Sequence, residues 1–289
     1  MTPDRFGLVA ETVGVGLLGL IVGSFANVCI HRLPRGRSVV WPGSACPSCD
    51  ASIRWYDNLP VLSWILLAGR CRSCRAAIPP IYPAVEAASA VILLTLHAQH
   101  GLSVRWGALS WLAVSTLILV PIDLRHGILP DRVTLPGIAA GLIASVFGPV
   151  PGIRGALLGA AAGALIPLGI RGLYILYARR RTRFEAADAG GPDLPEEPED
   201  DRQREGMGLG DVKMLAMVGA FLGVPGVLLT MFLGSVIGTL VVVPMVLVGR
   251  QGMKTPVPFG PFLGLAALIS MFWGGEIIDW YLGLAIPWT

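Results

Sequence analysis

The sequence predicts an all-α polytopic membrane protein with about eight transmembrane helices and a small cytoplasmic zinc-knuckle insert. Three observations lead to this prediction. The chain of 289 residues is 54% hydrophobic and only 14% charged, whereas a soluble domain carries about 25% charged residues. The charged residues are concentrated between apolar runs that are long enough to cross a bilayer. Four cysteines form two C-x-x-C pairs within one of the polar segments.

Apolar runs of about 20 residues can cross the hydrocarbon core as helices. Eight segments meet or approach that length. They are residues 9–30, 83–100, 104–122, 133–149, 155–176, 212–224, 226–248 and 260–284. The sixth is short, and only Gly223-Val-Pro-Gly226 separates it from the seventh. We therefore expect this pair to form a tight helical hairpin.

The basic residues predict how the helices are oriented. Most of the 22 Lys and Arg residues lie in the loops after the first, third, fifth and seventh spans. Only Arg5, Arg105 and Arg154 lie on the other side. Because loops rich in Lys and Arg remain in the cytoplasm, we expect both termini outside and the cysteine-bearing loop in the cytoplasm.

The domain organisation follows from these segments. Residues 1–30 contain the first transmembrane helix, 31–82 form the cytoplasmic four-cysteine insert, and 83–289 form the membrane core. Within the core, residues 178–205 are first rich in Arg and then acidic, with few apolar residues. Such a composition cannot bury enough apolar surface to fold, so this loop is predicted to be flexible.

The insert contains a predicted metal site made of Cys46, Cys49, Cys71 and Cys74. The two pairs are separated by 21 residues, a spacing that suits a tetrahedral zinc site with four thiolate ligands. Four thiolates leave no open position, so the metal would be structural. Disulfides are the alternative, but a cytoplasmic loop is kept reduced. The residues expected to form a small core around the metal are Trp55, Tyr56, Leu62, Trp64 and Ile65.

Acidic residues at the membrane boundary are the candidates for chemistry. Asp123 ends the third span and Asp211 begins the sixth, which starts from the same face of the membrane. Asp131 lies near the start of the fourth span. Two carboxylates held close together share a proton, as aspartic-protease chemistry requires. The alternative is that these residues are unrelated caps at helix ends.

Asp211 lies in a glycine-rich turn that includes Gly208 and Gly210. Glycine lets the backbone turn tightly and approach its neighbours closely. Lys213 follows two residues after the carboxylate. It would either hold a substrate carboxylate or extend its ammonium group to the membrane interface.

Two motifs resemble the signatures of bacterial prepilin peptidases, the GxGD aspartic proteases of type IV pilus and type II secretion systems. The motifs are Asp123-Leu-Arg-His-Gly-Ile-Leu-Pro-Asp131 and Gly206-Met-Gly-Leu-Gly-Asp-Val-Lys213. The resemblance implies that Asp123 and Asp211 are catalytic and that Asp131 supports them. It implies cleavage of prepilin or pseudopilin leader peptides at the cytoplasmic face of a bacterial inner membrane, with periplasmic termini.

The amino-terminal half carries further resemblance to this family. The matching segments are residues 23–34, Arg54-Trp-Tyr-Asp-Asn-Leu-Pro-Val-Leu-Ser-Trp64 and Tyr82-Pro-Ala-Val-Glu86. The sequence departs from the family at Asp50 and Arg75, where glycine is expected after each knuckle. Many members with this half also N-methylate the new pilin amino terminus, with S-adenosylmethionine as methyl donor. Glu86 and Asn27 are candidates for binding the methyl donor, or equally buried polar anchors for helix packing.

The expected partners are prepilins or pseudopilins, the lipid bilayer and, as further candidates, the pilus or secretion machinery; no nucleic acid is expected. Two other classes of function compete with a protease. A transporter using membrane carboxylates as a proton relay predicts repeated halves with interrupted helices, and the sequence shows neither. A zinc-stabilised scaffold for a secretion machine would carry out no chemistry.

Overall fold

The computed structural model describes residues 3–148, 151–188, 208–247 and 258–285, and it confirms a helical polytopic membrane protein. The helices are α1 (Pro3–Arg32), α2 (Leu62–Leu66), α3 (Ile81–His100), α4 (Val104–His126), α5 (Asp131–Phe147), α6 (Gly152–Asp188), α7 (Leu209–Leu247) and α8 (Gly260–Ala285), with two short 3-10 helices, η1 (Leu33–Arg35) and η2 (Trp55–Asn58). Within those residues the only β pairing is two isolated bridges in the insert.

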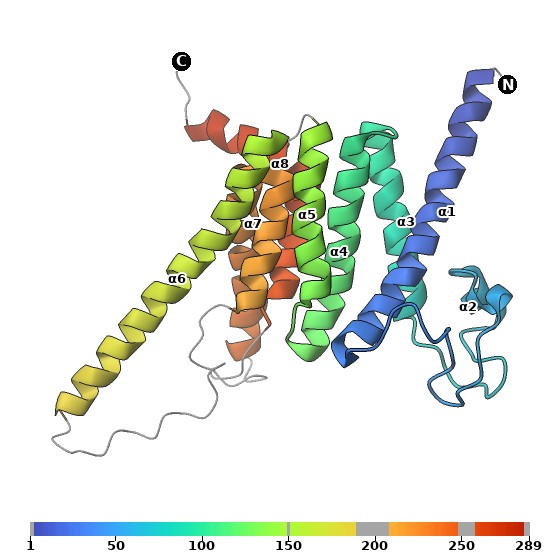
Figure 1. Ribbon diagram of the computed structural model, residues 1–289, viewed down its shortest axis with the longest axis horizontal. Coiled ribbons are helices and arrows are strands. Elements are labelled where there is room, and N and C mark those ends of the chain that lie inside the picture. The colour runs from blue at the N-terminus through green and yellow to red at the C-terminus, as the bar shows by residue number, and fades with distance from the viewer. Residues whose placement is uncertain (1–2, 149–150, 189–207, 248–257, 286–289) are drawn as a thin grey trace.

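Among the residues that the structure describes, six helices are long and apolar enough to cross a membrane: α1, α3, α4, α6, α7 and α8. The eight predicted spans correspond to these helices, to the shorter α5 of 17 residues and to a division of α7 into two arms. Figure 1 shows the helices side by side, with the start of α1 and the end of α8 at the same end of the molecule. We call the other end, where Asp123 and Asp211 lie, the aspartate end.

Helix α7 is the predicted hairpin. Gly223 has φ 70° and ψ −173°, which no helical residue adopts, and it divides α7 into two arms. A Cβ atom added to Gly264 of α8 would lie 3.4 Å from Met214 in the first arm, and one added to Gly234 in the second arm would lie 3.0 Å from the neighbouring Leu263. The two arms therefore run side by side in opposite directions.

Glycines allow the helix backbones to approach closely. A Cβ atom on Gly163 of α6 would lie 2.2 Å from the carbonyl oxygen of Leu215 in α7, and one on Gly23 of α1 would lie 2.6 Å from the Cα atom of Glu86 in α3. Small residues at such contacts are a general way of packing helices in membranes, where no hydrophobic effect drives helices together. The first arm of α7 is accordingly buried on nearly all sides.

Helix α6 is longer than the sequence suggests. It continues to Asp188, so the first part of the charged segment predicted to be flexible at 178–205 is helical instead. Alanine and arginine dominate this stretch, and both are strong helix formers that need no packing partner. The rest of that predicted loop, residues 189–205, lies outside the described residues.

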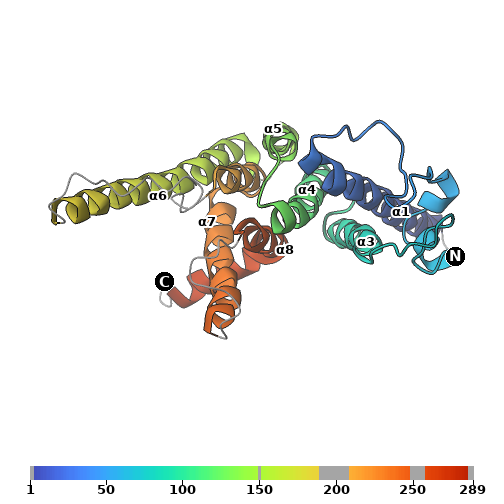
Figure 2. The ribbon, with the colours of Figure 1, turned by 90° about the horizontal axis from the view of Figure 1, so that it is seen from below.

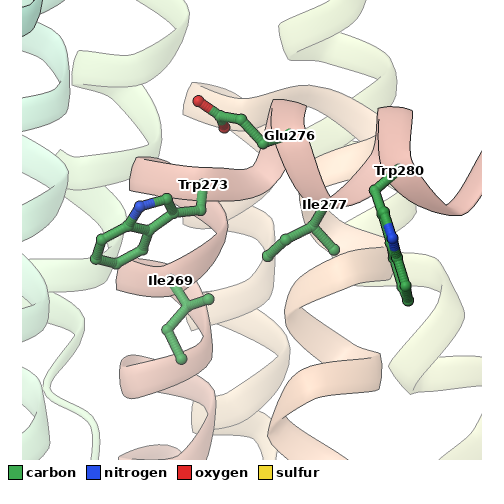
Figure 3. A pocket seen from close by; sticks show the side chains of 5 residues that line it. All are labelled: Ile269, Trp273, Glu276, Ile277 and Trp280. Carbon is green, nitrogen blue, oxygen red and sulfur yellow. The ribbon is translucent and has the colours of Figure 1, made fainter.

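A shallow hollow of about 390 Å³ lies on α8, lined by Ile269, Trp273, Glu276, Ile277 and Trp280. Figure 3 shows the two indole rings on either side of Ile277. Trp273 lies thirteen residues along α8 from Gly260, which is about 20 Å at the helical rise. This hollow is therefore remote from the aspartates, and its tryptophans suit the opposite membrane interface.

Candidate active site and metal centre

Asp123 lies in the last turn of α4. The helix ends at Gly127, which adopts a left-handed conformation (φ 61°) and donates its N–H to the carbonyl oxygen of Asp123 at 2.8 Å. Glycine adopts this conformation without the steric penalty that a Cβ atom brings. The Asp123 side chain points inward and is only 6% exposed.

Asp211 lies in the first turn of α7, as its third residue. Its side chain is also buried and lies within hydrogen-bonding reach of the backbone N–H of Gly208. The Gly208 carbonyl in turn accepts a hydrogen bond from the Asp211 N–H at 3.1 Å. The Asp211 side chain thus reaches the N–H of the residue three positions before it, as the acidic residue of a capping box does, while its carboxylate remains at the site.

The two carboxylates lie close enough for Asp123 to act electrostatically on Asp211. Helix α8 completes their surroundings. The backbone N–H of Gly260 lies within hydrogen-bonding reach of the Asp123 carboxylate, and a Cβ atom on Gly260 would lie 2.5 Å from Asp123 Oδ2. Three helices, α4, α7 and α8, thus meet around two buried acids.

The turn between α4 and α5 is attached to the start of α7 by two contacts. Leu129 packs on Gly210, where an added Cβ atom would lie 3.0 Å from the leucine Cβ. Lys213 Nζ lies 2.6 Å from Asp131 Oδ1. The structure thus places Asp131, Gly208, Gly210 and Lys213 around the start of α7, which carries Asp211. The sequence did not suggest that Lys213 would form an ion pair with Asp131. Leu129 was missed, although it lies between the two acids of the first motif.

The four knuckle cysteines converge. Their sulfur atoms all lie within 4.8 Å of one another, and Cys46 Sγ is 3.8 Å from Cys74 Sγ. Zinc–sulfur bonds of about 2.3 Å in a tetrahedron give sulfur–sulfur edges of about 3.8 Å, so the donor set fits a metal ion of that size. All five cysteines of the chain are free thiols in the structure, so the knuckle cysteines are not joined by disulfides there.

The knuckles keep their turns despite the missing glycines. Asp50 and Arg75, which stand where glycine was expected, have φ values of 54° and 60°. Each donates its backbone N–H to the carbonyl oxygen of the first cysteine of its knuckle, Asp50 to Cys46 and Arg75 to Cys71. Backbone N–H groups of Cys74 and Ser73 lower the pKa of Cys71 to about 7, whereas hydrogen bonds with the neighbouring thiols raise the pKa of Cys49 to about 12, so the four thiols share their protons as a group.

The insert lacks the small core that was expected. Trp64 is packed, with its indole N–H donating to the Ile78 carbonyl at 3.1 Å. Trp55, Leu62 and Ile65 are instead 79%, 51% and 61% exposed. Because the backbone of each knuckle is fixed by its own turn, these side chains are not needed to close the site.

Glu86 and Asn27 are both engaged in contacts within the protein. Glu86 Oε2 accepts the backbone N–H of Val61 at 2.7 Å, and Asn27 Nδ2 donates to the Tyr82 carbonyl at 2.9 Å. The Glu86 carboxylate is also within hydrogen-bonding reach of Ser24 and Asn27. These contacts join α1, α3 and the insert, as the alternative of buried polar anchors predicts.

Comparisons with known proteins find relatives of both the part of the chain that carries the cysteines and the part that carries the aspartates. Residues 17–100 match the bacterial peptidase A24 N-terminal domain, and residues 109–243 match the type IV leader peptidase family. A protein of Stutzerimonas stutzeri named prepilin leader peptidase/N-methyltransferase is 34% identical, with 99% of each chain covered. A Pseudomonas aeruginosa protein of the same name is 35% identical, with 93% of this chain and 92% of the relative covered.

A Burkholderia pseudomallei protein, also named prepilin leader peptidase/N-methyltransferase, is 34% identical, with 89% of this chain and 84% of the relative covered. No solved structure matches the chain. The matches extend over both the cysteine insert and the helices that carry the aspartates. The chain belongs to the type IV leader peptidase family.

Proposed function

We propose that this protein is a membrane aspartic endopeptidase that removes the leader peptide of type IV prepilins or pseudopilins and then methylates the new amino terminus. The observation that carries the peptidase activity is the pair of buried carboxylates, Asp123 and Asp211, at one end of the helix bundle. The match to the type IV leader peptidase family, and the name shared by its relatives, support the same activity.

The two acids would act as general base and general acid in hydrolysis. One, ionised, takes a proton from water as the water attacks the scissile carbonyl, and the other, protonated, supplies a proton to the substrate. Two adjacent buried carboxylates hold one proton between them more easily than two negative charges. Asp211 is our candidate for the ionised partner, because it lies at a helix amino terminus.

Asp131, Lys213, Gly208 and Gly210 are proposed to support the site. The Asp131–Lys213 ion pair and the contact of Leu129 with Gly210 fasten the start of α7 to the end of α4. Their role would be to hold the two aspartates at a fixed separation, because a small error in position lowers the rate steeply.

We assign the aspartate end to the cytoplasmic face of a bacterial inner membrane, because the basic loops join the helices at this end and loops rich in Lys and Arg remain in the cytoplasm. Both termini would then be periplasmic. A prepilin would place its apolar helix in the bilayer and its leader in the cytoplasm, which brings the scissile bond to the aspartates. Components of the pilus or secretion machinery are further candidate partners.

We assign zinc to the four cysteines, on the basis of the four-sulfur donor set and its fit to a tetrahedron. The ion would be structural and would supply stability to the insert, without a role in the chemistry. S-adenosylmethionine is the proposed methyl donor. Glu86 and Asn27 remain its candidate ligands, although their contacts favour a role in anchoring the insert.

The test is to incubate the purified protein with a prepilin and S-adenosylmethionine and to follow the substrate by intact-mass spectrometry. Loss of the leader together with the gain of one methyl group is expected, and the methyl gain should require the methyl donor. A substrate of unchanged mass would overturn the proposal in favour of the scaffold or the transporter. Cleavage without methylation would overturn only the second activity.

A further inference from the structure

Helix α2 of the insert exposes a continuous apolar face. Leu62, Ile65 and Leu66 are 51%, 61% and 74% exposed, and their spacing places them on one side of the helix. Trp55 in the preceding η2 is also exposed, at 79%. The opposite side of α2 carries Ser63 and Trp64, which bind within the insert. Exposed large apolar side chains gathered on one face indicate an interaction surface.

The depth of α2 along the transmembrane helices is fixed by one hydrogen bond. Val61, the residue before α2, donates its N–H to Glu86, which lies five residues into α3, about 7–8 Å from its start. Glu86 packs in turn against Gly23. Gly23 lies nine residues before Arg32, the end of α1, a distance of about 13–14 Å. Helix α2 therefore begins beside α1 and α3, at a level between the ends of these helices and not beyond the aspartate end of the molecule.

The backbone at this point is unusual. Val61 has φ 60° and ψ −49°, a conformation that a β-branched residue rarely adopts. Such a residue persists only where its surroundings hold it in place, and here the Glu86 carboxylate accepts its N–H. The insert is thus fixed to α3 at this depth by a directed contact.

The insert lies beside helices that are exposed to lipid at the level of α2. In both views the insert lies beside α1 and α3, away from α6 and α7 (Figures 1 and 2). Ile21 and Phe25 of α1, at a similar level to Gly23, are 61% and 50% exposed. At this level α1 therefore presents an apolar surface to the bilayer, on the side turned away from Gly23 and α3.

Basic residues border the same element. Arg54 precedes Trp55, while Arg70 and Arg72 follow α2. All three side chains are exposed, and within the insert Arg72 also pairs with Asp57 and Arg54 with Tyr56. Arginine side chains next to an apolar face suit a leaflet with anionic headgroups, and tryptophan favours the boundary between headgroups and hydrocarbon. This charge pattern favours a lipid surface over an apolar protein partner.

We propose that α2 inserts Leu62, Ile65 and Leu66 into the leaflet at the aspartate end and anchors the cysteine insert to the bilayer. The occupant of this surface is phospholipid, with acyl chains against the leucines and isoleucine and headgroups against the arginines. The insert is then seated partly within the membrane instead of lying free below it. This inference stands whether or not the chain cleaves prepilins.

The test uses the full-length protein in nanodiscs of anionic phospholipid that contain a diazirine within an acyl chain, followed by mass mapping of the labelled residues. Residues 62–66 should be labelled to a level comparable with Leu157, Leu158 and Leu165 of α6, which are exposed on a predicted span. A water-soluble diazirine should label residues 48–50 at the first knuckle instead. Labelling of α2 by the aqueous probe alone would overturn the proposal.

A pair of variants separates anchoring from folding. Replacing both Ile65 and Leu66 with Glu should abolish acyl-chain labelling of α2 and accelerate tryptic cleavage at Arg70, while the zinc content stays unchanged. The matched control replaces both with Phe and should keep the labelling. Unchanged labelling in the Glu variant, or cross-links from α2 to a second copy of the chain in place of lipid, would contradict lipid anchoring.

Discussion

In the membrane core from α4 to α8, helices meet backbone to backbone, and the aspartates lie where the ends of α4, α7 and α8 come together. In the insert, the four cysteines are carried by short turns with little apolar core. The core depends on close packing, whereas the insert depends on a metal ion and a few directed contacts. The two regions should therefore lose their structure in different ways when they are perturbed.

The largest expected effect is on chemistry alone. Asp123→Asn or Asp211→Asn removes a proton-transferring group and should lower prepilin cleavage by at least roughly 10²–10⁴-fold. Methylation of a pilin supplied already cleaved should continue, because the amino-terminal half is untouched. The measurement is the rate of each mass change, with zinc content and thermal unfolding as controls. Retained cleavage in either variant would refute the aspartate pair.

Removal of the metal should affect the insert and spare the helices. Zinc binding supplies about 10–16 kcal/mol of folding free energy in zinc-finger peptides at neutral pH, and the insert has little core of its own. Cys46→Ser or Cys71→Ser should therefore lose zinc and open the insert to trypsin, with helical circular dichroism retained. Cys29→Ser, in α1, is the matched control and should keep the metal. Collapse of the whole fold would show that the halves are not independent.

Shape dependence can be tested at two glycines of α6. A Cβ atom on Gly163 would overlap the backbone of Leu215, whereas one on Gly172 would meet nothing within 4 Å. Gly163→Ala should destabilise the protein by about 1–3 kcal/mol through overpacking. Gly172→Ala should be neutral or slightly stabilising. Unfolding midpoints in detergent would measure both, and equal midpoints would contradict close packing of α6 on α7.

The Asp131–Lys213 ion pair should have a smaller effect. Its side chains are 54% and 36% exposed, and exposed pairs contribute about 0.2–1 kcal/mol. Lys213→Met should lower kcat modestly and leave KM unchanged if the pair positions Asp211. The exchange of both residues, Asp131→Lys with Lys213→Asp, should restore part of kcat. A change in KM alone would indicate substrate binding by Lys213 instead.

The smallest expected effect is a gain in the stability of the zinc site. Asp50 and Arg75 adopt positive φ, a conformation that disfavours side chains by about 1–2 kcal/mol. Asp50→Gly or Arg75→Gly should relieve this strain, partly offset by the greater freedom of glycine in the unfolded chain. Zinc retention against a chelator would then increase slightly. Weaker retention would mean that these side chains stabilise their knuckles.

The sequence predicted most of the fold because the strongest constraints on it are local. Apolar length determines where a helix can cross the bilayer, and the Gly223–Gly226 segment indicated the reversal within α7. The two aspartates were placed together by the antiparallel order of spans alone. The contact of Leu129 with Gly210 and the approach of Gly260 to Asp123 could not be derived in this way, because they depend on how three helices pack.

The insert was the least predictable region. A short apolar run has the same pattern whether it faces a protein core or lipid, so Leu62 and Ile65 were expected to be buried and are exposed. The helical continuation of α6 to Asp188 was missed because a charged composition was taken to exclude order, although alanine and arginine favour helix without burial.

Gly260 has a consequence for how the gene tolerates mutation. Its backbone approaches the Asp123 carboxylate so closely that a Cβ atom would lie 2.5 Å from Oδ2. Every substitution at this codon adds that atom, whatever the chemistry of the new side chain. In a saturation-mutagenesis screen for cleavage, position 260 should therefore be as intolerant as the two acidic positions, although its residue has no side chain to contribute.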